Sequence, residues 1–234
     1  MKSMCVIVPT RGRPDKFAAF LDAWEDTGTE AHLVLRVDDD DPTLPDYQLP
    51  QWATVHKGPR IGMTPSLNEC AVEYAQRFDI VGHMGDDHHA RTLHWDERVA
   101  EALDTPGMAF CNDLYQADEY GMPTQVFISS EIIRALGFMS LPGIKHFGDV
   151  YWHTLGVMLK RLRYLPDVII EHMHFGNEKA ERDDTYELGG GSHGQLCIDQ
   201  NLHIQHFESG GMQRDVDRVN RALKVARSRR RRGR

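Results

Sequence analysis

Apolar runs and segments of helical periodicity alternate along the first part of the chain. Four runs have the length and composition of short strands, namely Lys2–Thr10, His32–Val37, Trp52–Val55 and Asp79–Met84. Between them the apolar residues fall at helical spacing, in a helix that opens at Pro14 and a second over Ser66–Arg77. This alternation predicts an α/β fold whose mostly parallel sheet is flanked by helices on both faces.

The pattern becomes less regular in the second half of the chain. It predicts helices over Leu93–Ala102, Ser130–Leu136 and Asp149–Lys160, and a strand at Val168–Glu171. Residues Asn177–Gly211 are polar, and we expect the glycine run Gly189–Gly191 to act as a mobile hinge. Gln213–Ala226 has the spacing of a basic helix. We therefore expect one domain over residues 1–186 and a flexible, then helical, extension over residues 187–234.

Polar clusters follow three of the predicted strands at the point where each strand ends. Thr10-Arg11 follows the first strand, Asp38–Asp41 the second, and Asp86–His89 the fourth. In open parallel sheets ligands bind outside the carboxyl ends of the strands. The three clusters are therefore expected to meet in one binding site.

Composition is compatible with a single α/β domain, because 41% of the 234 residues are hydrophobic. The apolar runs are too short to span a bilayer, and no signal-peptide pattern opens the chain, so we expect a cytoplasmic protein without a membrane partner. The four cysteines form no CxxC pair and are expected to be reduced thiols. The sequence does not indicate an oligomeric state.

The net charge of −8 conceals an uneven distribution. Residues Arg214–Arg234 hold ten Lys and Arg against two Asp, whereas the rest of the chain holds 17 Lys and Arg against 33 Asp and Glu. An acidic body with a basic end suggests a polyanionic partner at that end. The alternative is a basic tail that only aids solubility.

Asp86 and Asp87 are the first candidates for metal ligands. Adjacent carboxylates in a turn repel each other unless a cation or strong donors compensate them. A divalent ion, Mn²⁺ or Mg²⁺, that bridges the carboxylates to a diphosphate would do so. The alternative is a solvated turn or a helix N-cap.

A third ligand is expected from the histidines after the last predicted strand. His172 and His174 lie two residues apart there, and we expect only one of them to reach a given metal. His174 is the preferred ligand, and His172 is the alternate.

Asp149 follows His146-Phe147-Gly148 at the start of a predicted helix. It is a candidate general base that would deprotonate an acceptor hydroxyl. It could equally serve as a helix N-cap. Two basic loops, Thr10–Arg13 and Lys57–Arg60, are expected at the same edge of the sheet, where arginines would bind diphosphate oxygens.

Taken together, these motifs resemble the family 2 glycosyltransferases of GT-A fold. The resemblance covers roughly Met4 to Tyr186. It is carried by Val6–Pro14, Asp38, Arg60-Ile61-Gly62 with Leu67-Asn68, Met84–His88, His146–Asp149 and His172-Met173-His174. Where the family has Asp-x-Asp, this chain reads Gly-Asp-Asp-His, so that His88 is an alternate to Asp87 as the terminal metal ligand.

The resemblance implies a metal-dependent, inverting transfer from a nucleotide-diphosphate sugar, with a UDP-sugar favoured as donor. Asp86, Asp87 and His174 would hold the metal, and Asp149 would be the catalytic base. The nucleotide sugar would be bound by Pro9, Thr10, Arg11, Arg13, Asp38, Arg60 and Asp86.

The acceptor is suggested only by the basic end of the chain. Phage-type enzymes glycosylate hydroxymethylated bases in DNA, and a flipped base would present such a hydroxyl. DNA bound through the tail is therefore the expected acceptor. Two other functions stay open: an inactive nucleotide- or carbohydrate-binding module, and a nucleotidyltransferase, although Thr10–Arg13 only partly imitates the glycine-rich loop of the latter.

Overall fold

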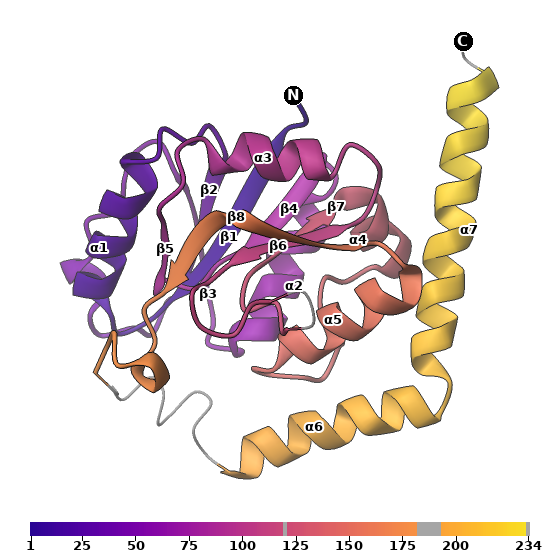
Figure 1. Cartoon of the computed structure of the whole chain (residues 1–234). Helices are drawn as coiled ribbons and strands as arrows, with labels where there is room; N and C mark the ends of the chain where they lie inside the picture. Colours follow the sequence, from indigo (N-terminus) through magenta and orange to yellow (C-terminus); the bar gives the residue numbers. More distant parts are fainter. Residues whose placement is uncertain (119–120, 182–192, 233–234) are drawn as a thin grey trace.

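The computed structural model describes residues 1–118, 121–181 and 193–232, and Figure 1 shows the arrangement of its elements. A single eight-stranded sheet has the order β3-β2-β1-β4-β7-β6-β8-β5. The strands are β1 (Met4–Thr10), β2 (His32–Asp38), β3 (Thr54–Gly58), β4 (Ile80–His83), β5 (His88–Ala90), β6 (Met108–Asn112), β7 (Val126–Ser129) and β8 (Leu162–His172).

The α/β prediction is confirmed, and β1 to β4 form its parallel half. Their connections run through α1 (Pro14–Glu25), a 3₁₀ turn at Leu44–Asp46, and α2 (Met63–Tyr74). Since these four strands point the same way, their carboxyl ends meet at one edge. Among the described strands, four of the seven pairings are parallel, because β7 runs antiparallel to both β4 and β6, and β5 antiparallel to β8.

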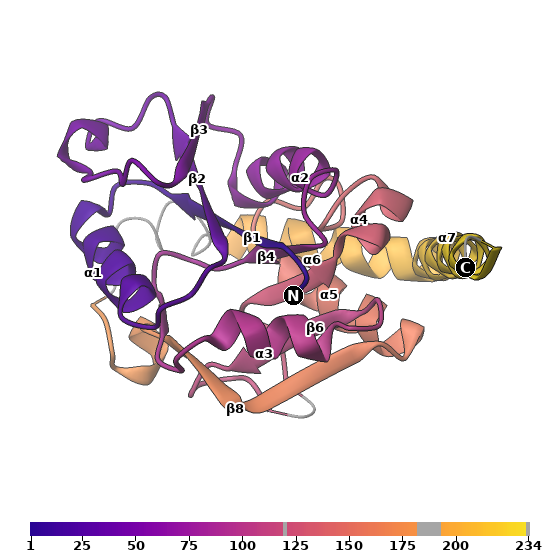
Figure 2. The ribbon, with the colours of Figure 1, turned by 90° about the horizontal axis from the view of Figure 1, so that it is seen from above.

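Helices cover both faces of the sheet (Figure 2). Side chains of β1 alternate between two cores: Val6 and Val8 pack with α1 and α3 (Trp95–Ala102), whereas Cys5 and Ile7 pack with the helices of the other face. Those helices are α2, α4 (Ser130–Leu136), α5 (Gly148–Leu159) and α7 (Gly211–Arg232).

The described part of the C-terminal extension is helical, although only the second of its two helices was expected. α6 (His193–Glu208) lies beside α5 along the lower side of the domain in Figure 1, and α7 packs against α4 and α5. Met212, Val216, Val219 and Leu223 of α7 belong to the core. The proposed boundary between residues 186 and 187, and the glycine run Gly189–Gly191, lie outside the described residues.

Among the α-helices and strands of the described residues, four were not predicted: β5, β6, β7 and α6. Each of the strands has five residues or fewer, which is too short for a periodic pattern, and they are stabilised by pairing with distant segments. α6 was missed because its sequence is polar and its apolar residues do not form one face. No described helix has both the length and the apolarity needed to cross a bilayer.

Gly82 in β4 provides a test of the packing of side chains from neighbouring strands on one face of the sheet. A Cβ there would lie 2.6 Å from Cδ1 of Phe127 and 3.1 Å from Cγ2 of Val6. Replacing Gly82 with alanine is expected to lower the free energy of unfolding in urea by about 1–3 kcal/mol, the usual range for overpacking a filled core.

The matched control is Gly194→Ala in α6, where the new Cβ would contact nothing within 4 Å. This variant is expected to keep or slightly raise stability, by up to about 1 kcal/mol, because alanine favours helix more than glycine does. Equal effects of the two substitutions would contradict the packing described here.

Candidate active site

Three potential metal ligands meet beyond the carboxyl end of β4. Asp87 ends the turn after β4, His88 begins β5, and the antiparallel register of β5 and β8 places His172 directly opposite His88. The two imidazole rings stack with centroids 4.2 Å apart. Asp87 Oδ1 lies 3.3 Å from His88 Nδ1 and 3.7 Å from His172 Nε2. The three residues can offer ligand atoms that all lie within 4.8 Å of one another.

The chemistry of these side chains fits a divalent cation. Within the described part of the chain, His88 Nε2 and His172 Nδ1 are buried without a hydrogen-bond partner. Leaving a buried polar group unpaired costs about 1–3 kcal/mol, and coordination of an ion through these two nitrogens would remove that cost. The nitrogens nearest Asp87 are the other two, and of these His88 Nδ1 already accepts the N–H of Gly85 at 3.0 Å. Burial, followed by the proximity of His88, lowers the pKa of His172 to about 3, so that its imidazole is neutral and can act as a ligand.

Asp86 has a different set of contacts. Thr10 Oγ1 donates to Asp86 Oδ2 at 2.7 Å, and Arg13 Nη1 lies 3.0 Å from Asp86 Oδ1 and 3.4 Å from Asp87 Oδ2. Burial, then the charge of Asp87, raises the pKa of Asp86 to about 6, and Arg13 opposes this rise. Arg13 is therefore the cation that compensates the two carboxylates in this structure.

The cluster differs in composition from the expected ligand set. Asp87 is common to both, and the cluster also holds His88 and His172, which were expected as alternates to Asp87 and His174, but not Asp86. The ring of His174 nevertheless lies 4.9 Å from that of His172, because residues two apart in extended chain share a side. The expectation that only one of these two histidines can face the site is therefore not supported.

Loops after β1 and β2 bring the expected nucleotide-binding residues together. Arg11 forms ion pairs with Asp38, at 3.3 Å, and with Asp40. Burial raises the pKa of Asp38, against the opposing charges of Arg36 and Arg11. Pro9 is the partly buried penultimate residue of β1.

Two residues of this region were not identified from the sequence. Arg36 is 2% exposed within β2, contacts Asp38 Oδ1 at 3.3 Å and donates to the carbonyl of Pro59 at 2.8 Å. The sequence did contain a signal for Arg36, because it is a charged residue within an otherwise apolar strand. The Tyr47 hydroxyl accepts from the backbone N–H of Arg13 at 2.9 Å, and nothing in the sequence pattern indicated it.

Asp149 lies in the first turn of α5, on the segment that follows the loop of residues 145–147. This loop is joined to the start of α2, since the N–H of Thr64 donates to the carbonyl of Lys145 at 3.0 Å. Burial lowers the pKa of His146, the charge of Asp199 opposes this, and the charges of Lys145 and of Arg60 in the exposed β3–α2 loop add to the lowering. Burial raises the pKa of Asp149 itself, so its proton is held more tightly than that of an ordinary carboxyl.

A loop after β6 covers the histidines and was also missed. The Oδ1 atom of Asp113 accepts three successive backbone N–H groups, those of residues 115–117, each at 2.8 Å. Tyr115 then stacks on His174 at 5.4 Å and meets His172 edge-on at 6.0 Å. The signal was present, because Asp113 directly follows the apolar run of β6.

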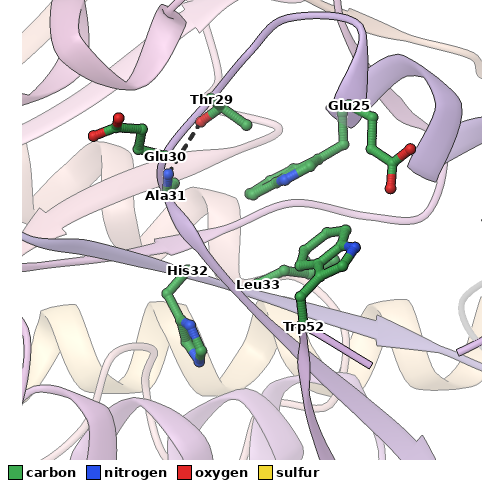
Figure 3. Close-up of a pocket in the computed structure, with 8 residues that line it drawn as sticks. Glu25, Thr29, Glu30, Ala31, His32, Leu33 and Trp52 are labelled. Carbon is green, nitrogen blue, oxygen red and sulfur yellow. Dashed lines mark hydrogen bonds between the residues drawn. The ribbon is translucent and has the colours of Figure 1, made fainter. Parts of the chain in front are cut away.

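A separate hollow of about 400 Å³ lies at the amino end of β2 (Figure 3). It is lined by Trp24, Glu25, Thr29, Glu30, Ala31, His32, Leu33 and Trp52. None of the residues expected at the active site lines it. It lies at the opposite end of β2 from Asp38, and we assign it no part in the chemistry.

The sequence matches no protein-family model and no curated protein. In structure the chain is similar to Staphylococcus aureus TarS 1-349, with a TM-score of 0.55 and 12% identity, over 97% of this chain and 91% of that one. It is similar to Rv0371C from Mycobacterium tuberculosis H37Rv in complex with manganese, with a TM-score of 0.52 and 13% identity, over 76% and 95% of the two chains.

It is also similar to glucosyl-3-phosphoglycerate synthase from M. tuberculosis in complex with Mn²⁺, UDP and phosphoglyceric acid. The TM-score is 0.53 and the identity 11%, over 80% of this chain and 73% of that one. Identities this low establish the fold alone. The chain has the GT-A fold.

Proposed function

We propose that this protein is a metal-dependent glycosyltransferase that moves a sugar from a nucleotide-diphosphate sugar to an acceptor hydroxyl. The observation that carries the proposal is the cluster of Asp87, His88 and His172, with two unpaired imidazole nitrogens, at the ligand-binding edge of a GT-A fold. The UDP and metal complex of a structural neighbour supports a UDP-sugar as donor and Mn²⁺ or Mg²⁺ as the ion.

The residues divide into three groups in the proposed reaction. Asp87, His88 and His172 would hold the ion, and His174 and Asp86 lie beside them. Once bound, such an ion supplies electrostatic stabilisation to a diphosphate leaving group. The guanidinium groups of Arg11 and Arg13 bind phosphate oxygens, with Thr10, Asp38 and Arg60 on the nucleotide side.

Asp149 is the proposed general base. It accepts the proton of the acceptor hydroxyl while the bond to the anomeric carbon forms on the face opposite the departing diphosphate, which gives inversion. Burial suits this role, because a raised pKa makes a carboxylate a stronger base near neutral pH.

The two other functions differ from this proposal in what they require. An inactive binding module has no need for unpaired metal-ligand nitrogens in a buried cluster, because they destabilise the fold. A nucleotidyltransferase would release diphosphate from a nucleoside triphosphate and a sugar phosphate, whereas a glycosyltransferase releases nucleoside diphosphate from a nucleotide sugar.

The test is the release of nucleoside diphosphate from a panel of nucleotide sugars, with Mn²⁺, Mg²⁺ or EDTA. Metal-dependent release from one donor, with water as acceptor, is the expected result. Release of diphosphate from a nucleoside triphosphate and a sugar phosphate would favour a nucleotidyltransferase. Thermal stabilisation by a nucleotide without any turnover would favour the binding module.

The exposed face of α7 supports a polyanionic acceptor such as DNA carrying hydroxymethylated bases. Arg214, Arg218, Arg221 and Lys224 are exposed at helical spacing, opposite the face that packs on the core, and Asp217 is exposed with them. Such a row of cations neutralises phosphates and releases counterions.

We expect the protein to be retained on DNA-cellulose and to elute as salt is raised. We compare it with a variant that carries glutamine in place of Arg214, Arg218, Arg221 and Lys224. This variant should elute at a lower salt concentration, because it has lost cations that contact phosphates. The control, Arg91→Gln, removes an exposed cation that lies outside α7 and pairs with Glu171. Identical elution of all three proteins would remove DNA as the favoured acceptor.

A further inference from the structure

Helix α6 contacts the loop before α5 through two polar side chains. The carboxylate of Asp199 accepts the backbone N–H groups of Lys145 at 3.2 Å, His146 at 2.9 Å and Phe147 at 3.4 Å. One turn later, His203 Nε2 donates to the carbonyl of Phe147 at 3.1 Å. Asp199 and His203 are four residues apart and so share one face of α6.

These two residues are also the ones that α6 buries. Asp199 is 0% exposed and His203 is 8% exposed, and among the described side chains of α6 no other is buried. The apolar residues Ile198, Ile204 and Phe207 are each more than half exposed. A helix that docked only for hydrophobic stability would bury such residues instead. The buried side chains of α6 therefore both contact this one loop, while His206 pairs with Asp215 of α7 at 2.9 Å and Leu202 packs, partly buried, against the core.

The loop that α6 contacts lies between α6 and the proposed base. Residues 145–147 lead directly into α5, whose first turn carries Asp149, and the loop is joined to α2 by the Thr64–Lys145 hydrogen bond. The contacts of Asp199 are charge-assisted and buried, which makes them stronger than ordinary neutral hydrogen bonds. They fix three consecutive amides immediately before the proposed base.

We propose that α6 forms part of the acceptor side of the active site, with Asp199 as a positioning residue that holds the loop of residues 145–147 and thereby orients Asp149. This inference rests on the proposed function, because it assumes that Asp149 is the base. It extends that function by making residues of the C-terminal extension necessary for turnover.

The geometry distinguishes two substitutions at this position. In the wild type, Gln195 donates to Asp199 Oδ1 at 2.7 Å, and Oδ2 accepts the N–H groups of His146 and Phe147. In Asp199→Asn, the amide oxygen can keep the bonds from His146 and Phe147. The new NH₂ group then faces Gln195, and the Gln195 amide can turn so that its oxygen accepts from that group. In Asp199→Ala, every one of these bonds is lost. Asparagine should therefore restore most of what alanine removes.

The experiment measures UDP release from UDP-glucose with Mn²⁺, together with hydrogen–deuterium exchange of the peptide that spans residues 145–149. For Asp199→Ala we expect faster amide exchange and a kcat lowered on the order of 10- to 100-fold, the scale of a misplaced catalytic group. The KM for UDP-glucose should stay within about twofold, since the contacts of the nucleotide side are untouched. Asp199→Asn should lie close to the wild type in both measurements.

The matched control is Asp96→Ala. Asp96 is 3% exposed on α3 and accepts the N–H of Glu30 at 3.0 Å, so its loss also removes a buried carboxylate from a backbone amide, away from the loop. It should leave kcat and the exchange of residues 145–149 unchanged.

Each other outcome has a defined meaning. Unchanged exchange in Asp199→Ala would overturn the attachment, and faster exchange with an unchanged kcat would overturn the positioning role. An equal loss of kcat in Asp96→Ala would mean that the loss in Asp199→Ala comes from general destabilisation of the fold. If the wild type releases no nucleoside diphosphate from any donor of the panel while the exchange responds to Asp199→Ala, the proposed function fails, the positioning role fails with it, and the attachment of α6 stands.

Discussion

Replacement of His88 with alanine is expected to weaken Mn²⁺ binding by at least about 100-fold, since loss of even an outer partner of a metal ligand costs about 10- to 100-fold. Metal-dependent UDP release should fall to the level measured in EDTA. The reason is that His88 supplies one of the three side chains of the cluster and lies opposite His172 in the β5–β8 pairing. Titration calorimetry with Mn²⁺ alone measures the first effect, without any need for turnover.

His89→Ala is the matched control. His89 follows His88 in β5, points to the other face of the strand and faces Glu171 in the register. This variant removes an imidazole from the same three-residue strand and should bind Mn²⁺ like the wild type. Comparable losses in both variants would mean that β5 has been disrupted, and unchanged affinity in His88→Ala would exclude His88 as a ligand.

Asp149→Asn is expected to lower kcat by about 10²- to 10⁴-fold, the usual contribution of a positioned base. UDP binding in the presence of Mn²⁺ should be unchanged, because Asp149 belongs to the loop and helix that meet α6. The activity of the wild type should increase with pH through the pKa of Asp149. Burial raises that pKa, so the increase is expected at a higher pH than for an ordinary carboxyl, and it should vanish in the variant.

Asp15→Asn separates this role from helix capping. Asp15 lies in the first turn of α1, as Asp149 does in α5, so both substitutions remove a favourable interaction with the helix dipole of about 0.3–1 kcal/mol. Only the substitution in α5 should reduce kcat. The N-cap position of α5 is Phe147, so an Asp149→Asn protein with full transfer activity would show that this carboxylate acts only on the helix dipole.

The N-terminal half of the fold was predictable because its determinants are local. The apolar run of β1, the proline at the start of α1 and the polar residues after each strand all lie within a few positions of one another. Thr10, Arg11, Asp38 and Asp86 could accordingly be assigned to one edge of the sheet from the sequence alone, and they do meet there.

The ligand set depended on information that no local pattern contains. His88 and His172 are brought together by the pairing of a three-residue strand with the end of an eleven-residue one, far apart in the chain. The buried partners Arg36 and Tyr47, and the contacts of Asp199, likewise depend on tertiary structure.

The ion pair of Arg13 with Asp86 and Asp87 implies a thermodynamic coupling between metal and nucleotide. A divalent ion that neutralises these carboxylates weakens their hold on the guanidinium, which then becomes available to phosphate oxygens. Each ligand should therefore raise the affinity of the protein for the other by the same factor, as linkage requires. The buried carboxylates would remain neutralised at every stage, by arginine in the absence of metal and by the ion when the donor is bound.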